Sequence, residues 1–260
     1  MSQATEAATP PPTETSGRDQ HARWPSAVVT GASSGVGRAL ALALAARCQY
    51  VALVGRDAAR LAAVSREVQG HGAQAACFVA DFERREAPVQ LALELEASLP
   101  ALSVLVHSAG RFVSGALETA SADDFDRAMD VNLRAPYLLT RELSGALCAG
   151  RGDVVFINSS VVGQRRAGLA AYAASKQGLL ALADSLRQEI NPSGVRVLSV
   201  FLGATATPMQ EQIYSRDGRA YRPEALLQPA DVAQVVMNVI AMPRGAEVTD
   251  LHLRPATAHR

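Results

Sequence analysis

Two residues with complementary acid–base chemistry, Tyr172 and Lys176, lie four positions apart. The breaker-free stretch 168–190 predicts a helix, so both side chains share one face. A phenol is a weak acid near neutrality, and an ammonium group one turn away lowers its pKa. The phenol can then exchange a proton with an alcohol or carbonyl oxygen. An exposed Tyr and Lys at a helix start is the other interpretation, but this is the only lysine among 25 basic residues.

A serine is placed where a substrate carbonyl could be held. Ser160 follows the apolar run 153–158, a predicted strand. Open α/β sheets bind ligands at the carboxyl ends of their strands. Its hydroxyl could therefore hydrogen-bond a carbonyl oxygen near Tyr172. Alternatively, Ser159 and Ser160 are simply turn residues.

Asn132 precedes Pro136 by four residues in a predicted long helix, 123–149. Proline has no N–H, so the Asn132 carbonyl loses its helical hydrogen-bond partner. A freed carbonyl can anchor a water near Lys176. A proline kink with no functional content is the alternative, and both interpretations stay open.

A glycine-rich turn joins the first predicted strand, 27–30, to a helix. Gly31 would allow the tight turn, Gly35 would let the backbone approach a pyrophosphate, and Gly37 would let the helix pack closely on the sheet. The helix N-terminus offers unpaired N–H groups to the anion. An ordinary strand–helix turn is the alternative, but the context favours dinucleotide binding. The cofactor-binding residues predicted here are Gly31, Ser33, Ser34, Gly35 and Val36.

The residue after the second predicted strand selects between nicotinamide cofactors. An acid there binds the ribose 2′-OH of NAD, whereas an arginine accepts the 2′-phosphate of NADP. Arg56 follows the predicted strand 50–54 after one residue, Gly55, which leaves room for a ligand, and Asp57 comes next. A solvated Arg56 beside a helix-capping Asp57 is the alternative. We favour NADP over NAD.

Strict alternation of strands and helices predicts the elements that position these residues. The strands are continuous apolar runs, which is typical of a parallel sheet covered on both faces. The fold expected is therefore α/β, a doubly wound parallel sheet of Rossmann type, in a single domain over 24–260. Residues 1–23 read as a disordered tail, and the patternless 205–228 as a lid. Predicted strands are 27–30, 50–54, 75–80, 102–107, 153–158, 195–201 and 247–253; predicted helices are 36–48, 58–69, 87–98, 123–149, 168–190 and 229–241.

Charge and cysteine content exclude several classes of protein. The 25 basic and 25 acidic residues give a net charge of zero, which offers no reason to expect a nucleic-acid or anionic-membrane partner. No apolar run reaches the ~18 residues of a membrane helix. Three widely spaced cysteines without a C-x-x-C pair argue against disulfides and a metal site, and predict a reducing compartment. The N-terminus lacks a signal-peptide core, so we expect a cytoplasmic protein.

Together these motifs resemble the short-chain dehydrogenase/reductase family, in its compact single-domain branch. The resemblance covers about 24–255, and its motifs follow in the family's order and spacing. The matching positions are Thr30-Gly31-x-x-x-Gly35-x-Gly37, Asp81, His107-Ser108-Ala109-Gly110, Asn132, Ser160, Tyr172-x-x-x-Lys176 and Leu202-Gly203 with Thr207.

The resemblance implies a catalytic role for four residues. Tyr172 would be the general acid/base, Lys176 would lower its pKa and hold the nicotinamide ribose, and Ser160 would orient the carbonyl. Asn132 would hold the water of a proton relay. The resemblance also implies further cofactor contacts, made by Asp81, Phe82, Ala109, Gly110, Thr205 and Thr207.

Three positions depart from the family pattern. His107 and Ser108 stand where the family has two asparagines, and Leu202 replaces a proline. The first change puts the side-chain contacts in doubt, and the second implies a less rigid loop. The ending, 247–255, lacks the glycine-rich pattern of fatty-acid-type ketoreductases, which puts that substrate class in doubt.

These observations predict an NADP(H)-dependent oxidoreductase that interconverts a ketone or aldehyde and an alcohol. Alternatives are an NAD-dependent alcohol dehydrogenase of the same family and a non-catalytic sensor of nicotinamide cofactors. The partner expected is a small molecule, and the family implies a homodimer or homotetramer through helices 123–149 and 168–190. Arg165 and Arg166 either favour an anionic substrate or are merely solvated.

Overall fold

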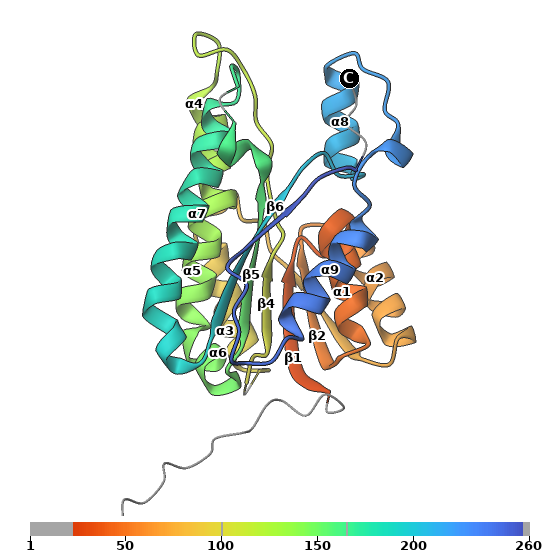
Figure 1. Cartoon of the computed structure of the whole chain (residues 1–260), viewed down its shortest axis with the longest axis vertical. Helices are drawn as coiled ribbons and strands as arrows, with labels where there is room; N and C mark the ends of the chain where they lie inside the picture. Colours follow the sequence, from red (N-terminus) through yellow and green to blue (C-terminus); the bar gives the residue numbers. More distant parts are fainter. Residues whose placement is uncertain (1–22, 100, 165, 257–260) are drawn as a thin grey trace, which may run out of the picture.

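A seven-stranded sheet forms the centre of the molecule, in the order β3-β2-β1-β4-β5-β6-β7 (Figure 1). The computed structural model describes residues 23–99, 101–164 and 166–256. All neighbouring strands are parallel, which confirms the predicted doubly wound α/β fold. The strands are β1 Trp24–Thr30, β2 Cys48–Gly55, β3 Gln74–Val79, β4 Val104–His107, β5 Asp153–Ser159, β6 Arg196–Leu202 and β7 Asp250–Leu253.

Helices cover both faces of the sheet (Figure 1). One apolar cluster joins the sheet to α1, α2 and α9, and a second joins it to α3, α5 and α7. Neighbouring strand residues such as Val28 and Val29 enter opposite clusters, which explains why the strands read as unbroken apolar runs. The helices of these layers are α1 Gly35–Ala45, α2 Ala58–Gly70, α3 Ala87–Glu96, α5 Ala135–Glu142, α7 Ala170–Ile190 and α9 Pro229–Ile240.

The predicted single helix 123–149 is wrong, because the chain there forms four shorter segments. A π-helical turn, Asp130–Arg134, holds Asn132, and Pro136 lies in the first turn of the next helix. Proline has no N–H to continue the regular ladder, so the register changes where it enters. The flanking segments are α4 Ala122–Met129, α5 and α6 Ser144–Gly150.

The segment 205–228, predicted to be a patternless lid, contains a helix. This is α8, Pro208–Arg216, and a short 3-10 turn follows at Pro223–Ala225. Backbone hydrogen bonds close the base of the segment, from the Ala206 N–H to the Leu227 carbonyl at 2.8 Å and from the Leu227 N–H to the Ala204 carbonyl at 3.0 Å. Figure 1 shows α8 above α9 and α1, across from α4 and the upper end of α7. That the segment acts as a lid stays a prediction.

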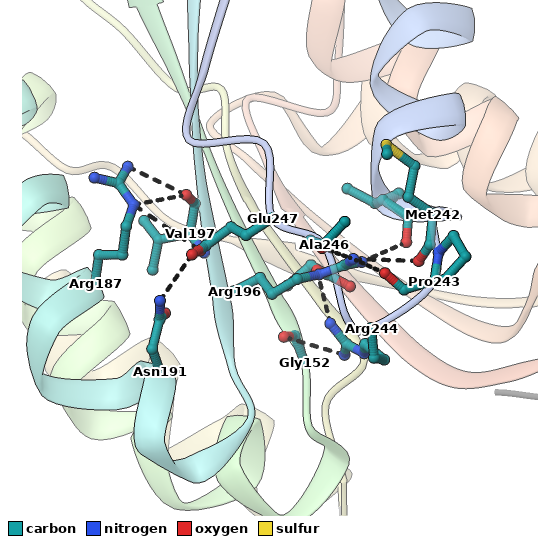
Figure 2. Close-up of polar contacts among 12 residues, drawn as sticks. Gly152, Arg187, Asn191, Arg196, Val197, Met242, Pro243, Arg244, Ala246 and Glu247 are labelled. Carbon is teal, nitrogen blue, oxygen red and sulfur yellow. Dashed lines mark hydrogen bonds and ion pairs between the residues drawn. The ribbon is translucent and has the colours of Figure 1, made fainter. Parts of the chain in front are cut away.

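Polar contacts fix the loop that leads into the last strand (Figure 2). The Arg196 guanidinium donates to the Asp153 carboxylate at 2.7 Å and to carbonyls at the end of α9 and in the loop. The Glu247 carboxylate accepts from the Val197 N–H at 2.8 Å and from Asn191 at 2.7 Å. Because a side chain takes this N–H, the strand predicted from residue 247 begins only at Asp250.

The predicted N-terminal tail lies outside the described residues except for Arg23. This arginine donates to the Gly72 carbonyl at 2.7 Å and the Ala45 carbonyl at 2.5 Å, just before β1. Within 23–99, 101–164 and 166–256, no helix is both long and apolar enough to cross a membrane.

Candidate active site

A cavity of about 1680 Å³ opens at the carboxyl edge of the sheet. The edge includes the switch point between β1 and β4, where the chain's strand order reverses and doubly wound folds bind their ligands. The residues predicted to bind cofactor or act in catalysis line this cavity, with the exception of Asn132. Asn132 is buried, at 1% exposure.

The glycine-rich turn is shaped by close backbone approaches. Gly31 has φ +65°, and a Cβ there would lie 2.7 Å from the Ala109 nitrogen. A Cβ on Gly37 would collide with the Gly31 carbonyl, because α1 packs directly on the turn. Only glycine fits these two positions. The turn therefore presents its backbone and the α1 N-terminus to the cavity, an arrangement that suits a pyrophosphate.

Thr30 holds the neighbouring turn after β4. Its hydroxyl accepts from the N–H groups of Ser108 at 3.1 Å and Ala109 at 3.2 Å, and donates to the Val106 carbonyl at 3.2 Å. These contacts use the backbone of the turn, so they do not need the asparagine side chains that His107 and Ser108 replace. The backbone turn after β4 therefore forms even though His107 and Ser108 stand where the family has asparagines.

Tyr172 and Lys176 lie on α7 and face the cavity. Burial raises the pKa of Tyr172, and a hydrogen bond with the Ser159 side chain acts in the opposite direction. Burial lowers the pKa of Lys176 to about 8, and its Nζ donates to the Ile157 carbonyl at 2.8 Å. The net shift of the phenol's pKa is therefore upward, because desolvation outweighs the hydrogen bond with Ser159, while the Lys176 amine binds a backbone carbonyl. The lowering of this pKa by Lys176 stays a prediction.

Asn132 is connected to Tyr172 through a residue that sequence reasoning missed. Its Nδ2 donates to the Ser175 Oγ at 2.9 Å, and the Ser175 hydroxyl donates to the Tyr172 carbonyl at 2.8 Å. Asn132 also exchanges two hydrogen bonds with the Arg111 backbone, at 2.8 and 2.9 Å. The Asn132 side chain thus joins α7 to the loop after β4. Pro136 has no N–H with which to hydrogen-bond the Asn132 carbonyl. The position of Ser175 between Tyr172 and Lys176 was the available signal.

The structure brings Ser159, rather than Ser160, to the Tyr172 hydroxyl. Strand β5 extends one residue beyond its predicted end, so Ser159 is its last residue and Ser160 opens a 3-10 turn. Both serines line the cavity. Among the described residues, the Ser160 hydroxyl has no hydrogen-bond partner. The role predicted for Ser160 stays a prediction, and Ser159 is a second candidate.

The two serines provide a matched pair of variants. Removing a hydrogen-bond donor that stabilises a developing oxyanion lowers kcat on the order of 100-fold. We expect Ser159→Ala to show this loss and Ser160→Ala to stay within about tenfold of the wild type. Steady-state kinetics with a single carbonyl substrate compares them. A larger loss in Ser160→Ala would assign the role to Ser160.

An ion-pair cluster surrounds Arg56 at the adenosine end of the cavity. Its guanidinium lies 3.3 Å from the Glu83 carboxylate, which also binds Arg111 at 2.6 Å. Asp57 caps α2 by accepting from the Arg60 N–H at 3.0 Å, so the alternative weighed for Asp57 is correct. Arg56 remains 67% exposed, so its guanidinium can still reach an anion. Sequence reasoning missed Glu83.

The other predicted cofactor residues also lie at this edge. Asp81 accepts from the Glu83 N–H at 3.2 Å, and Phe82 is buried beside it. Thr205 donates to the Gly203 carbonyl at 2.9 Å, and the Thr207 hydroxyl caps α8 by accepting from the Gln210 N–H at 3.2 Å. The four residues line the cavity, and their contacts with a cofactor stay predictions.

His107 is fully enclosed beneath the site. Its ring stacks on Phe156 with centroids 5.0 Å apart, and its Nε2 lies 2.8 Å from the Thr140 hydroxyl. Burial lowers the pKa of His107 to about 3. The imidazole is thus neutral at ordinary pH and packs as an aromatic core residue.

This burial predicts an acid-sensitive fold. Below pH 6.5 an unfolded His107 binds a proton that the folded protein accepts only near pH 3, so stability falls as pH falls through this window. At pH 5 the loss should be about 2 kcal/mol. Urea unfolding from pH 7 to 5 measures it for the wild type, for His107→Asn and for the exposed control His71→Asn. A dependence on pH that His107→Asn leaves unchanged would contradict the assignment.

Phe112 connects Tyr172 to α8. Its ring lies 5.0 Å from the Tyr172 ring, at an interplanar angle of 57°. The Arg216 guanidinium lies 5.2 Å from the centroid of the same Phe112 ring, and it also donates a hydrogen bond to the Ser114 hydroxyl. These aromatic and cationic contacts join the 205–228 segment to the floor of the cavity.

No group of three or more His, Cys, Asp or Glu side chains that could hold a metal ion occurs within the described parts of the chain. The catalytic candidates in the cavity are a phenol, an amine and hydroxyls, which are groups that can transfer protons.

Comparison with known proteins finds a family model, curated relatives and solved structures that agree with one another. The family model described as short chain dehydrogenase matches residues 25–218. An uncharacterised oxidoreductase of Staphylococcus saprophyticus is 29% identical over 88% of this chain and 96% of its own. An alcohol dehydrogenase from Thermococcus sibiricus, complexed with 5-hydroxy-NADP, superposes with a TM-score of 0.81 at 25% identity, over 92% of this chain and 99% of its own. A metagenomic short-chain oxidoreductase in complex with NADP gives 0.77 at 32% identity, over 90% and 98%.

Proposed function

Because the chain belongs to the short-chain dehydrogenase family of oxidoreductases, we propose that it interconverts a ketone or aldehyde and an alcohol with NADP(H). The observation that carries this proposal is the position of Tyr172. Its phenol faces a large cavity and hydrogen-bonds the Ser159 side chain, and Lys176 lies one helical turn away. A sensor of nicotinamide cofactors would not need this arrangement.

The residues present fit a dinucleotide. The glycine-rich turn allows a close backbone approach, Ser33 and Ser34 add hydroxyls, and Arg56 can receive a 2′-phosphate. Two solved relatives were crystallised with NADP or a derivative of it. When bound, the reduced nicotinamide supplies the hydride for the carbonyl carbon.

The chain's own residues would handle the proton and the developing charge. In the reducing direction, Tyr172 donates its phenolic proton to the carbonyl oxygen as that oxygen becomes an alkoxide. The pKa of Tyr172 lies above the ordinary value of a phenol, so at neutral pH the side chain holds the proton that a general acid donates. A serine hydroxyl, from Ser159 or Ser160, hydrogen-bonds the same oxygen. Lys176 would hold the ribose hydroxyls and replenish the proton.

Cofactor titration and turnover test the proposal together. Nicotinamide fluorescence gives the Kd for NADPH and NADH, and absorbance follows NADPH oxidation with a panel of diketones and aldehydes. We expect tighter NADPH binding and measurable reduction. Preference for NADH would favour an NAD-dependent alcohol dehydrogenase, and binding without turnover of any carbonyl would favour a sensor. We also propose a homodimer or homotetramer through α4, α5, α6 and α7, and light scattering would check the mass of the assembly.

A further inference from the structure

The two halves of the cavity differ in charge. The cofactor half is formed by the glycine-rich turn, the ends of β2 and β3 and residues 108–111, and the substrate half by 112–116, 166–172, the 205–228 segment and Arg254–Pro255. In the cofactor half, three arginines face three carboxylates: Arg56, Arg60 and Arg111 with Asp57, Asp81 and Glu83. In the substrate half, four arginines face one carboxylate: Arg166, Arg216, Arg219 and Arg254 with Asp217. The whole chain carries no net charge, so this is a local excess.

The carboxylate of the substrate half is already paired. Asp217 accepts from the Arg216 guanidinium at 2.7 and 3.0 Å, and the same guanidinium lies over Phe112 and bonds Ser114. These contacts within the protein hold Arg216 at the cavity wall, although its side chain is 47% exposed. Its charge is largely neutralised by its neighbour in sequence.

The other three arginines keep their charge available. No ion pair joins Arg166, Arg219 or Arg254 to a carboxylate in the part of the chain that the structure describes. The Arg219 guanidinium lies 4.2 Å from the Tyr214 ring centroid, and Tyr214 is buried. An arginine stacked on a ring keeps its donor edge free for a bidentate contact with an anion. Arg254 leaves β7 against Gly203, whose Cβ position lies 3.3 Å from the Arg254 Cα.

We propose that the substrate carries an anionic group, a carboxylate or a phosphate, which these three arginines bind at a distance from the reacting carbonyl. Guanidinium groups match the geometry of both anions and bind them bidentately. The positive charge of the arginines at the cavity mouth also raises the rate at which an anionic substrate encounters the protein, and added salt screens this attraction. This inference rests on the proposed carbonyl reduction, because that reaction defines the substrate half. It decides between the two interpretations of Arg166 in favour of binding.

A pair of aldehydes that differ only in charge tests the proposal. 4-Formylbenzoate has a carboxylate across the ring from its carbonyl, and its methyl ester is neutral. We expect the kcat/KM for the carboxylate to exceed that for the ester by about tenfold at low salt, and the ratio to fall as salt is added. Arg166→Gln, Arg219→Gln and Arg254→Gln should each reduce the ratio about two- to fivefold, the effect of one exposed charge.

Arg222→Gln is the matched control. Arg222 is exposed on the same 205–228 segment but does not line the cavity, so its loss should leave the ratio unchanged. Equal kcat/KM for the two aldehydes, or an equal effect of Arg222→Gln, overturns the proposal while leaving carbonyl reduction intact. A change confined to the Kd for NADPH would also overturn it, because the arginines would then serve the cofactor.

Binding separates this inference from the proposed function. The Kd of each aldehyde is measured by calorimetry with the NADP⁺ complex, which has no hydride to transfer and therefore cannot reduce the aldehyde. If neither aldehyde is reduced but the carboxylate still binds more tightly through the three arginines, the anion site stands and the proposed reaction fails. If both bind equally, the anion site is overturned.

Discussion

The Tyr172→Phe variant should lose turnover by roughly 100- to 10,000-fold while NADPH binding is unchanged. The substitution removes one oxygen, the one that would donate the proton to the developing alkoxide. The ring itself stays, so its contact with Phe112 and the packing of α7 should persist. Single-turnover kinetics with NADPH and a reactive aldehyde measure the loss, and nicotinamide fluorescence measures the Kd. Turnover within about tenfold of the wild type would rule out Tyr172 as the general acid.

Ser159→Ala makes the interpretation of that variant sharper. The pKa of Tyr172 is raised by burial and lowered by its bond with Ser159, so removing the hydroxyl should raise the pKa further. Any alkaline limb of the pH profile for reduction that belongs to this phenol would then move to higher pH. A purely structural loss would lower the rate at every pH without moving the limb.

Arg56→Ala should weaken NADPH binding roughly tenfold and leave NADH binding nearly unchanged. A charge-assisted contact with a phosphate contributes about 1.5–3 kcal/mol, and the exposure of Arg56 places the effect at the lower end. The phosphate must also compete with Glu83, which holds the guanidinium at 3.3 Å. Fluorescence titration of both cofactors measures the two changes.

Arg84→Ala is the matched control for this variant. Arg84 is as exposed as Arg56 and pairs with Glu86, but it does not line the cavity. The Arg84→Ala substitution removes the same charge from the same side of the protein, but outside the cavity lining, so NADPH binding should not change. If Arg56→Ala weakens NADPH and NADH equally, the 2′-phosphate is not the group that Arg56 binds.

The sheet was predictable because burial on both faces leaves a direct mark on the strands. An apolar run such as β5 reads as a buried strand whatever surrounds it. The glycine-rich turn was equally visible, since a position such as Gly31, where a Cβ would meet the Ala109 backbone, admits no other residue. These features depend on local sequence, and the structure reproduces them.

The features that sequence reasoning missed depend on other parts of the chain. Helix α8 is mostly polar and buries one residue, Tyr214, so it lacks the apolar pattern of a core helix. The signal available was Thr207 followed by proline, which is a typical start of a helix. The direction of the pKa shift at Tyr172 is set by burial from several elements, and spacing to Lys176 carries no information about it.

The single lysine has a consequence for covalent labelling. Lys176 is 5% exposed, lines the cavity and has a pKa of about 8, so much of it is the unprotonated amine under mildly alkaline conditions. Apart from the amino terminus, no other primary amine exists in the 260 residues. An amine-directed reagent therefore has one side-chain target, and that target lies inside the cavity. The mass label on the peptide that contains Lys176 reports how open the cavity is, and it is read separately from the label on the amino terminus.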